Sequence, residues 1–127
     1  MKKSSFVGVL LLGAVAAAGA QQAGFTRSVL QQVDLSIPGR EAITARAEFQ
    51  PGGSVGRHTH FGEEIGYVAG GAVTVEIDGV TKVVKAGEAF IIPAGKPHNA
   101  TNAGPGTASL VITYVVEKGK PLATPVK

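Results

Sequence analysis

The sequence predicts an all-β domain built as a sandwich or barrel of short antiparallel strands. Several runs alternate between apolar and polar residues, and glycine- or proline-containing turns separate them. No window of useful length shows the 3.6-residue period of an amphipathic helix. A chain of 127 residues has the length of one domain.

The alternation is clearest in Arg40–Phe49, which predicts a strand with one buried face. Its apolar positions are Ile43, Ala45, Ala47 and Phe49. Asp78-Gly79 separates two further runs and predicts a type I′ hairpin, because both central residues of that turn need positive φ. The other predicted strands are Ala72–Ile77, Val80–Val84, Glu88–Ile92 and Thr107–Val116.

The first twenty residues differ from the rest and resemble a secretory signal peptide. Lys2 and Lys3 form a basic start, Phe6–Ala20 is a fifteen-residue apolar or small run, and Ala18-Gly19-Ala20 offers a small-x-small cleavage site. An uncleaved membrane anchor is the alternative, but a span needs about 20 apolar residues. We therefore expect a periplasmic or secreted protein with no stable membrane anchor after cleavage.

The predicted mature chain has ten basic and nine acidic residues, which gives a formal charge of +1 instead of +3. No basic face stands out and aromatic residues are few, so the sequence gives no support for nucleic-acid binding. The chain has no cysteine and therefore no disulfides. We divide it into a signal peptide (1–20), an N-terminal strand or arm (21–39), a β-barrel domain (40–116) and a C-terminal tail (117–127), which we expect on the surface or against a partner.

Two of the three histidines lie one residue apart, in the stretch "GRHTHFGEE". If Arg57–His60 is extended, His58 and His60 point to the same face, which is a spacing suited to metal ligands. A turn at Phe61-Gly62 could bring Glu63 or Glu64 back toward them. The third histidine, His98, follows a proline- and glycine-rich turn at the start of another expected strand.

The spacing around these histidines is more specific than the pair alone. The first stretch reads Gly52, five residues, His58-Thr59-His60, three residues, Glu64, six residues and Gly71. The second reads Gly87, five residues, Pro93-Ala94-Gly95, two residues, His98, three residues and Asn102. Both stretches resemble the two conserved motifs of the cupin family, with a gap of fifteen residues between them. The resemblance covers about Arg40 to Val116.

The resemblance implies a double-stranded β-barrel, or jelly roll, with two antiparallel sheets. It also implies that His58, His60, Glu64 and His98 bind one divalent metal inside the barrel. Motif spacing selects Glu64 over Glu63, and strand parity allows only one of the two to face the site. Nitrogen-rich ligands of this kind suit Fe, Mn, Ni, Cu or Zn.

Other residues near the motifs have structural interpretations. We expect Asn102 to be a hydrogen-bonded turn or edge amide, Tyr67 a core or interface residue, and Arg46 a solvent-facing residue. Phe49, Phe90 and Tyr114 are expected in the core, with Tyr114 able to reach a cavity wall. Ala45, Ala47 and Ala100 are candidates for the interior lining.

The family hosts many chemistries, so three functions stay open. The first is an oxygen-dependent metalloenzyme of dioxygenase type, acting on a small enolic or phenolic substrate; the catalytic residues are unknown. The second is a non-catalytic periplasmic module that binds a metal or a small ligand. The third is a structural dimer whose metal only stabilises the fold. Small barrels of the family commonly pair, so we expect a homodimer, with Arg27–Ile37 and the tail as candidate interface arms.

Export predicts that the mature chain begins at Gln21, since the cleavage site ends at Ala20. The intact mass of the exported protein, measured by mass spectrometry, checks this directly. A mass that still contains residues 1–20 would contradict the prediction.

Overall fold

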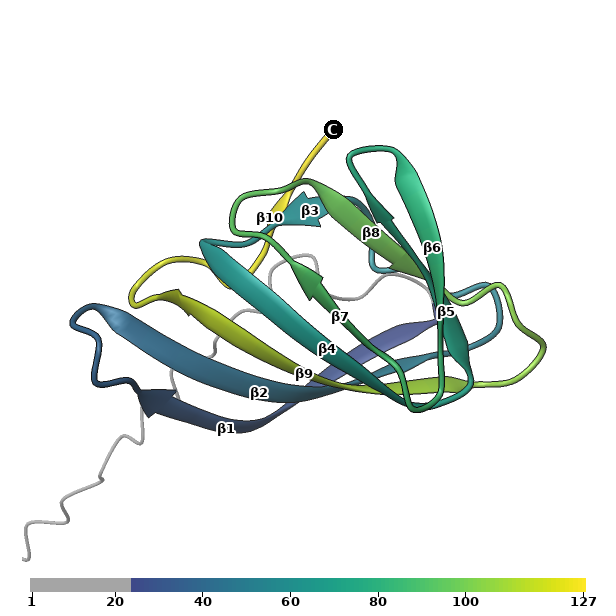
Figure 1. Cartoon of the computed structure of the whole chain (residues 1–127), viewed down its shortest axis with the longest axis horizontal. Coiled ribbons are helices and arrows are strands. Elements are labelled where there is room, and N and C mark those ends of the chain that lie inside the picture. The colour runs from purple at the N-terminus through teal and green to yellow at the C-terminus, as the bar shows by residue number, and fades with distance from the viewer. Residues whose placement is uncertain (1–23) are drawn as a thin grey trace, which may run out of the picture.

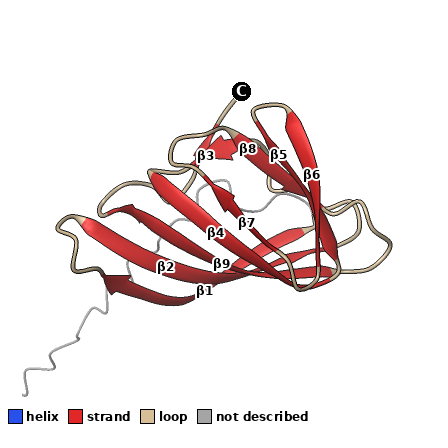
Figure 2. Cartoon of the chain, viewed as in Figure 1, coloured by secondary structure: helices blue, strands red, loops and turns tan. Residues whose placement is uncertain are grey.

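The computed structural model describes residues 24–127, so the predicted signal peptide lies outside the described residues. Ten β-strands make up two five-stranded sheets in which every strand pair is antiparallel. In the described part of the chain, no helix is long and apolar enough to cross a membrane. Figures 1 and 2 show the two sheets facing each other, as a jelly roll requires.

The first sheet has the order β1-β2-β9-β4-β7. Its strands are β1 (Phe25–Asp34), β2 (Arg40–Phe49), β9 (Ala108–Glu117), β4 (Gly62–Gly70) and β7 (Ala89–Ile92). The second sheet has the order β10-β3-β8-β5-β6. Its strands are β10 (Thr124–Pro125), β3 (His58–Thr59), β8 (His98–Thr101), β5 (Ala72–Ile77) and β6 (Val80–Lys85).

The all-β jelly roll is confirmed, but the predicted barrel is open. The strands form two separate sheets, and within residues 24–127 they do not close into a single hydrogen-bonded barrel. Each sheet therefore keeps edge strands, which are β1 and β7 in the first and β10 and β6 in the second. The edge strand β1 becomes important at the site, because its first residues lie over the cavity.

The core lies between the sheets and follows the predicted alternation. In β2 and β9 every second residue is buried, and small side chains of β2 lie opposite large ones of β9. Ala45 pairs with Ile112, and Ala47 pairs with Leu110. Each large apolar side chain buried in this way contributes about 1.5–3 kcal/mol to the free energy of unfolding. The paired strands β2 and β9 thus form a well-packed part of the sheet that faces the site.

The predicted hairpin is present between β5 and β6. Asp78 has φ of 49° and Gly79 has φ of 83°, so both central residues are in the left-handed region that a type I′ turn needs. A side-chain oxygen of Glu76 accepts a hydrogen bond from the backbone N–H of Gly79 at 3.1 Å. The hairpin fixes the register of β5, which in turn pairs with β8 and positions His98.

The C-terminal tail does not simply lie on the surface. Thr124–Pro125 pairs with β3, and the backbone N–H of Val126 donates to the carbonyl of Arg57 at 3.0 Å. The tail thus supplies the edge strand next to the paired histidines. Nothing in its composition indicated this role, because two residues of strand are too few to show a period.

Candidate metal centre

Strand pairing brings the three histidines together. His58 lies in β3 and pairs in register with His98, the first residue of β8. His60 follows two residues after His58, on the same side of the chain. All three side chains are buried, with relative exposures of 3–6%. Their ring centroids are 4.2–4.9 Å apart. The predicted shared face of His58 and His60 is confirmed.

Strand parity also determines which of the two acids faces the histidines. Along β4 the residues alternate between buried and exposed, which leaves Glu64 buried and Glu63 exposed. The Oε2 atom of Glu64 lies 3.0 Å from Nε2 of His98 and 3.7 Å from Nε2 of His60. Gly62 allows β4 to start here, because a Cβ at this position would lie 1.8 Å from the carbonyl oxygen of Val115.

Each imidazole has its Nδ1 atom against a backbone carbonyl. For His58 the partner is the carbonyl of Gly56 at 2.6 Å, and for His98 it is that of Lys96 at 2.8 Å. For His60 it is the carbonyl of Leu122 in the tail. A carbonyl can only accept a hydrogen bond, so each Nδ1 carries the proton. A neutral ring then has an unprotonated Nε2 with its lone pair directed into the cavity.

Burial and charge set the protonation states of these groups. Burial lowers the pKa of His58 to about 4 and also lowers that of His60. Burial acts in the same direction on His98, but its hydrogen bond and ion pair with Glu64 outweigh burial and raise its pKa. Burial alone would raise the pKa of Glu64, yet the neighbouring histidines lower it. Near neutral pH the site therefore holds neutral His58 and His60 beside an ionised Glu64.

This donor set fits a metal cation. The Nε2 atoms of His58 and His60 are 3.1 Å apart, and with both protons on Nδ1 their lone pairs face each other. The Nε2 atom of His98 is buried beside Oε2 of Glu64, with which a protonated ring forms an ion pair at 3.0 Å. One ligand atom from each histidine lies within 4.8 Å of the others, so the three could hold a metal ion. A cation among these donors would remove the lone-pair repulsion.

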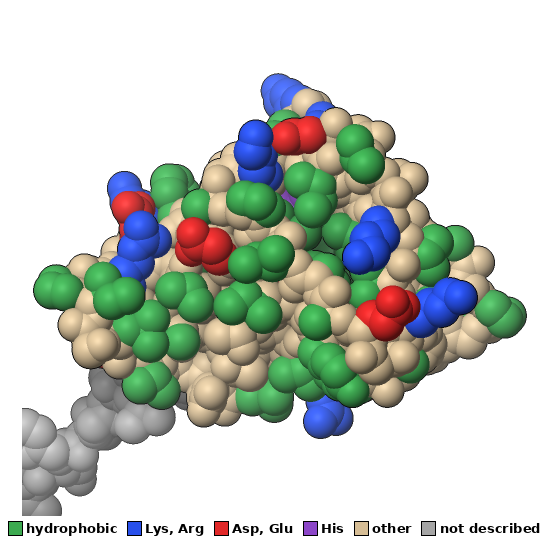
Figure 3. All heavy atoms as spheres, viewed as in Figure 1, with side chains coloured by type: hydrophobic (Ala, Val, Ile, Leu, Met, Phe, Trp, Pro, Cys, Tyr) green, Lys and Arg blue, Asp and Glu red, His purple; other side chains and the backbone are tan. Residues whose placement is uncertain are grey.

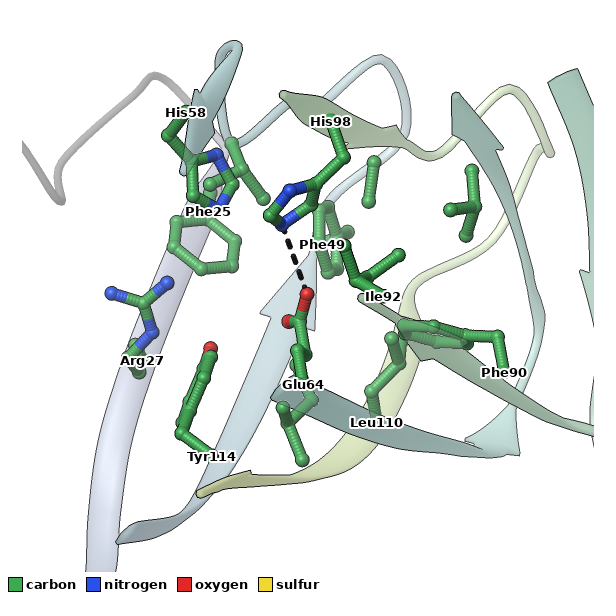
Figure 4. Close-up of a pocket in the computed structure, with 14 residues that line it drawn as sticks. Phe25, Arg27, Phe49, His58, Glu64, Phe90, Ile92, His98, Leu110 and Tyr114 are labelled. Atoms are coloured by element: carbon green, nitrogen blue, oxygen red, sulfur yellow. Dashed lines mark ion pairs between the residues drawn. The ribbon is translucent and has the colours of Figure 1, made fainter. Parts of the chain in front are cut away.

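The cavity beside the histidines is narrow and mostly apolar (Figure 4). Its polar lining consists of His58, Glu64, His98, Arg27 and Tyr114. The apolar lining consists of Phe25, Phe49, Val55, Val75, Phe90, Ile92, Ala100, Leu110 and Ile112. The room left for a water-sized sphere is about 10 Å³, which is about the space of one water molecule. The cavity therefore suits a small ligand.

Several interpretations of individual residues can now be compared with the structure. Asn102 is a hydrogen-bonded turn amide, as predicted: its Nδ2 donates to the carbonyls of Phe49 and Gly106, and its Oδ1 accepts from the backbone of Gly104. Tyr67 is about half exposed and does not belong to the core, so its alternative role as an interface residue stays a prediction. Ala45 and Ala47 are fully buried in the core, and Arg46 is exposed, as predicted.

Sequence reasoning missed three contributors to the site. Phe25 and Arg27 line the cavity from β1, although Arg27 counted only as part of a possible interface arm. Their separation of two residues was the available signal, because side chains alternate along a strand and Arg27 must therefore face the same side as the apolar Phe25. The carbonyl of Leu122 gave no signal, since every residue has one.

Comparison with known proteins places the chain. The family model described as "Cupin domain" matches residues 45–116. The chain belongs to the cupin family. The matched region includes β3, β4 and β8, which carry His58, Glu64 and His98. This cupin therefore has its family match over the strands that build the metal centre.

The chain is similar to parts of two curated proteins of different kinds. Germin-like protein 3-5 of Oryza sativa subsp. japonica is 37% identical over 78 residues, which cover 54% of this chain and 34% of the relative. The HTH-type transcriptional regulator PuuR of Escherichia coli (strain K12) is 33% identical over 78 residues, which cover 61% of this chain and 42% of the relative. The chain thus spans about a third to two fifths of the length of these relatives.

Among solved structures, an oxalate oxidase in complex with the substrate analogue glycolate is similar to this cupin. The TM-score is 0.67 with 28% sequence identity, over 85% of this chain and 58% of the other. The shared region is therefore a fold with the same arrangement of strands, while the remainder of the oxidase has no counterpart in this match.

The tail contact predicts that residues 121–127 support the metal centre. Their removal takes away the carbonyl that holds Nδ1 of His60, so the ring can rotate and its Nε2 loses its direction. Loss of such outer partners typically lowers metal affinity about 10–100-fold. Competition with a chromophoric chelator for Zn²⁺ measures the change, and removal of Lys127 alone serves as the control. Equal affinity of the folded truncated and full-length chains would contradict the role of the tail.

Proposed function

We propose that this cupin binds one divalent transition metal through His58, His60, Glu64 and His98, and uses it to bind a small oxygen-donor ligand. The observation that carries the proposal is the convergence of three histidine Nε2 atoms, each on a ring whose Nδ1 faces a backbone carbonyl, beside an ionised carboxylate. Three neutral imidazoles and one carboxylate leave a formal charge of +1 on a bound M²⁺ ion. Such donors suit Fe, Mn, Ni, Cu or Zn rather than Ca or Mg.

The bound ion would supply Lewis-acid or redox chemistry at positions that the four protein ligands leave open. The protein's own part is to hold the donors in a narrow cavity whose remaining lining is largely apolar. Electrostatic attraction to a small ligand is stronger in such surroundings than in solvent. Glu64 stays ionised in this setting because the histidines stabilise its charge.

The metal assignment predicts different outcomes for the two neighbouring acids. His58→Ala and His98→Ala should abolish binding of one metal per chain, and Glu64→Gln should weaken it about tenfold or more, because a charged oxygen ligand becomes neutral. Glu63→Gln is the matched control and should be silent, since Glu63 faces solvent. Elemental analysis and titration with Zn²⁺ give stoichiometry and affinity. Loss of metal in Glu63→Gln with retention in Glu64→Gln would refute the assignment.

We favour an oxygen-dependent oxidoreductase acting on a small enolic or phenolic substrate, because the proposed site leaves metal positions open to a small ligand. The oxalate oxidase match supports this class of chemistry without fixing the substrate. Because the free space is about that of one water molecule, even a small enol or phenol enters only if the edge strand β1 or a wall side chain moves. A substrate of several rings does not fit the space that the structure leaves.

A non-catalytic binding module is the second candidate, and the lining favours it. Beyond the proposed ligands, the titratable groups lining the cavity are Arg27 and Tyr114. An arginine remains protonated in proteins, and burial raises the pKa of the Tyr114 hydroxyl. Neither group is ready to accept a proton near neutral pH, so proton transfer would depend on Glu64 or on the substrate itself.

Anaerobic titration of the iron- or manganese-loaded protein with catechol, followed by air, separates the two candidates. The oxidoreductase should consume dioxygen with this substrate or with a small β-diketone, and His60→Ala should abolish the uptake. A binding module should give the spectral change of ligand binding without oxygen uptake. Binding without uptake across a panel of such ligands would overturn the enzyme and leave the module.

We also propose that the protein is exported, as the N-terminal sequence predicts, and that it forms a homodimer through β1. Beyond Arg27, β1 is exposed along its length, and Val29, Leu30, Val33 and the following Ile37 are each more than half exposed. An apolar edge strand of this kind is an association hazard unless a partner covers it. A second copy of the chain would cover it.

Light scattering coupled to size-exclusion chromatography should therefore report a dimer at micromolar concentration. The double substitution Leu30→Lys with Val33→Lys should shift it to monomer, because buried charges would oppose pairing. Val80→Lys, at an exposed apolar position of β6 in the other sheet, is the control and should leave the dimer intact. A monomeric wild-type protein would overturn the proposal.

A further inference from the structure

We propose that Arg27 and Tyr114 form an anion-binding subsite next to the metal centre, and that this subsite binds a small carboxylate. The inference rests on the proposed function, because one carboxylate oxygen would take an open position on the metal. The other oxygen would face the guanidinium of Arg27 and the hydroxyl of Tyr114. Figure 4 shows both groups at the same cavity as Glu64 and the histidines.

The hydroxyl of Tyr114 is a buried polar group without a partner. Tyr114 has 0% exposure, and its hydroxyl oxygen lies near Arg27 and Glu64 without a hydrogen bond of good geometry to either. The ring stacks at 4.8 Å from that of His60, and the residue lies opposite Glu64 in the register of β9 and β4. An unsatisfied buried hydroxyl destabilises the fold, so a ligand that accepts a hydrogen bond from it would recover this free energy.

Arg27 brings an uncompensated positive charge to the same place. Its guanidinium carbon is 5.4 Å from the ring centroids of both Phe25 and Tyr114, which fixes the side chain over the cavity. Its Nε atom is buried and has no hydrogen-bond partner. Arg27 takes part in none of the ion pairs found among residues 24–127. Glu64 does not serve it, because that carboxylate is engaged with His98 and His60.

These groups select an anion over a neutral ligand. Arginine and the tyrosine hydroxyl can both donate hydrogen bonds, and the planar guanidinium matches the two oxygens of a carboxylate. A metal with a residual charge of +1 attracts the same anion from the opposite side. A monocarboxylate would then have its charge balanced at one end by the metal and at the other by Arg27.

Size and polarity restrict the carbon part of the ligand. The free space is about that of one water molecule, which excludes large acids. Even a compact acid such as formate or acetate enters only if a partly exposed wall residue such as Arg27 moves. The walls around the carbon atoms are apolar side chains such as Phe49, Val75 and Ile92. They offer no partner to a hydroxyl-rich or amide-rich ligand, which would have to leave its polar groups unpaired.

The test compares acetate with acetamide, its neutral relative of the same shape, on the full chain loaded with Co²⁺. Visible absorption of the cobalt ion follows binding. The wild-type protein should bind acetate at least about tenfold more tightly than acetamide, since hydrogen bonds to charged groups contribute about 1.5–3 kcal/mol. Arg27→Gln should remove most of this preference while keeping one cobalt per chain, and Tyr114→Phe should reduce it several-fold. Arg46→Gln, which changes an exposed arginine of β2, should behave as wild type.

The outcomes separate this inference from the proposed function. Cobalt bound at one ion per chain with an unchanged acetate preference in Arg27→Gln and in Tyr114→Phe would overturn the subsite and leave the metal centre standing. Failure of the folded wild-type protein to bind cobalt would instead refute the metal centre. In that case the NMR signal of the Arg27 Nε–H group in the metal-free protein tests the subsite alone. A shift of this signal with acetate but not with acetamide supports the subsite, and no shift overturns it.

Discussion

The structure of the site depends on three hydrogen bonds from histidine Nδ1 atoms to backbone carbonyls. They fix the direction of His58, His60 and His98, so that three Nε2 atoms meet in a largely apolar cavity. Burial keeps two of these rings neutral, and Glu64 adds a negative charge beside them. An arrangement of this kind is unfavourable without a cation and favourable with one. Metal binding should therefore stabilise the folded chain as well as equip it for chemistry.

The carbonyls come from parts of the chain that are far apart in sequence, so the site depends on the whole fold. Gly56 precedes β3, Lys96 precedes β8, and Leu122 precedes β10 in the tail. The first sheet supplies Glu64 from β4 and the aromatic walls. A jelly roll brings these segments together because its two sheets face each other over one core (Figure 1).

Part of the surface is also apolar. In Figure 3, hydrophobic side chains are scattered over the face on which Figure 1 shows β2, β9 and β4, with few charged residues among them. The exposed apolar residues of β1 adjoin the strand's inner residues Phe25 and Arg27. Pairing of two chains along β1 would thus lie close to the residues that close the cavity. This connects the proposed assembly with the shape of the ligand site.

The sequence predicted five of the strands and the hairpin, because these depend on local alternation, and the resemblance of its two motifs to those of the cupin family implied the four converging side chains. Arg40–Phe49 and Ala72–Ile77 have the predicted bounds. It did not predict the roles of Arg27, Phe25 or Leu122, because these follow from how β1 and β10 add to the sheet edges. Pairing at a sheet edge is a long-range contact, and a two-residue strand such as β10 is too short to show a sequence pattern that predicts it. A backbone carbonyl is common to every residue and gives no signal either.

The central claim is that all three histidines hold the proton on Nδ1 and present Nε2 to the cavity. Long-range ¹H–¹⁵N correlation spectra of the zinc-loaded protein test it directly, because Zn²⁺ is diamagnetic and the two ring nitrogens have distinct shifts. The account predicts three rings with metal-bound Nε2 and protonated Nδ1. A ring of His58, His60 or His98 that binds zinc through Nδ1, or that remains free at one zinc per chain, would contradict it.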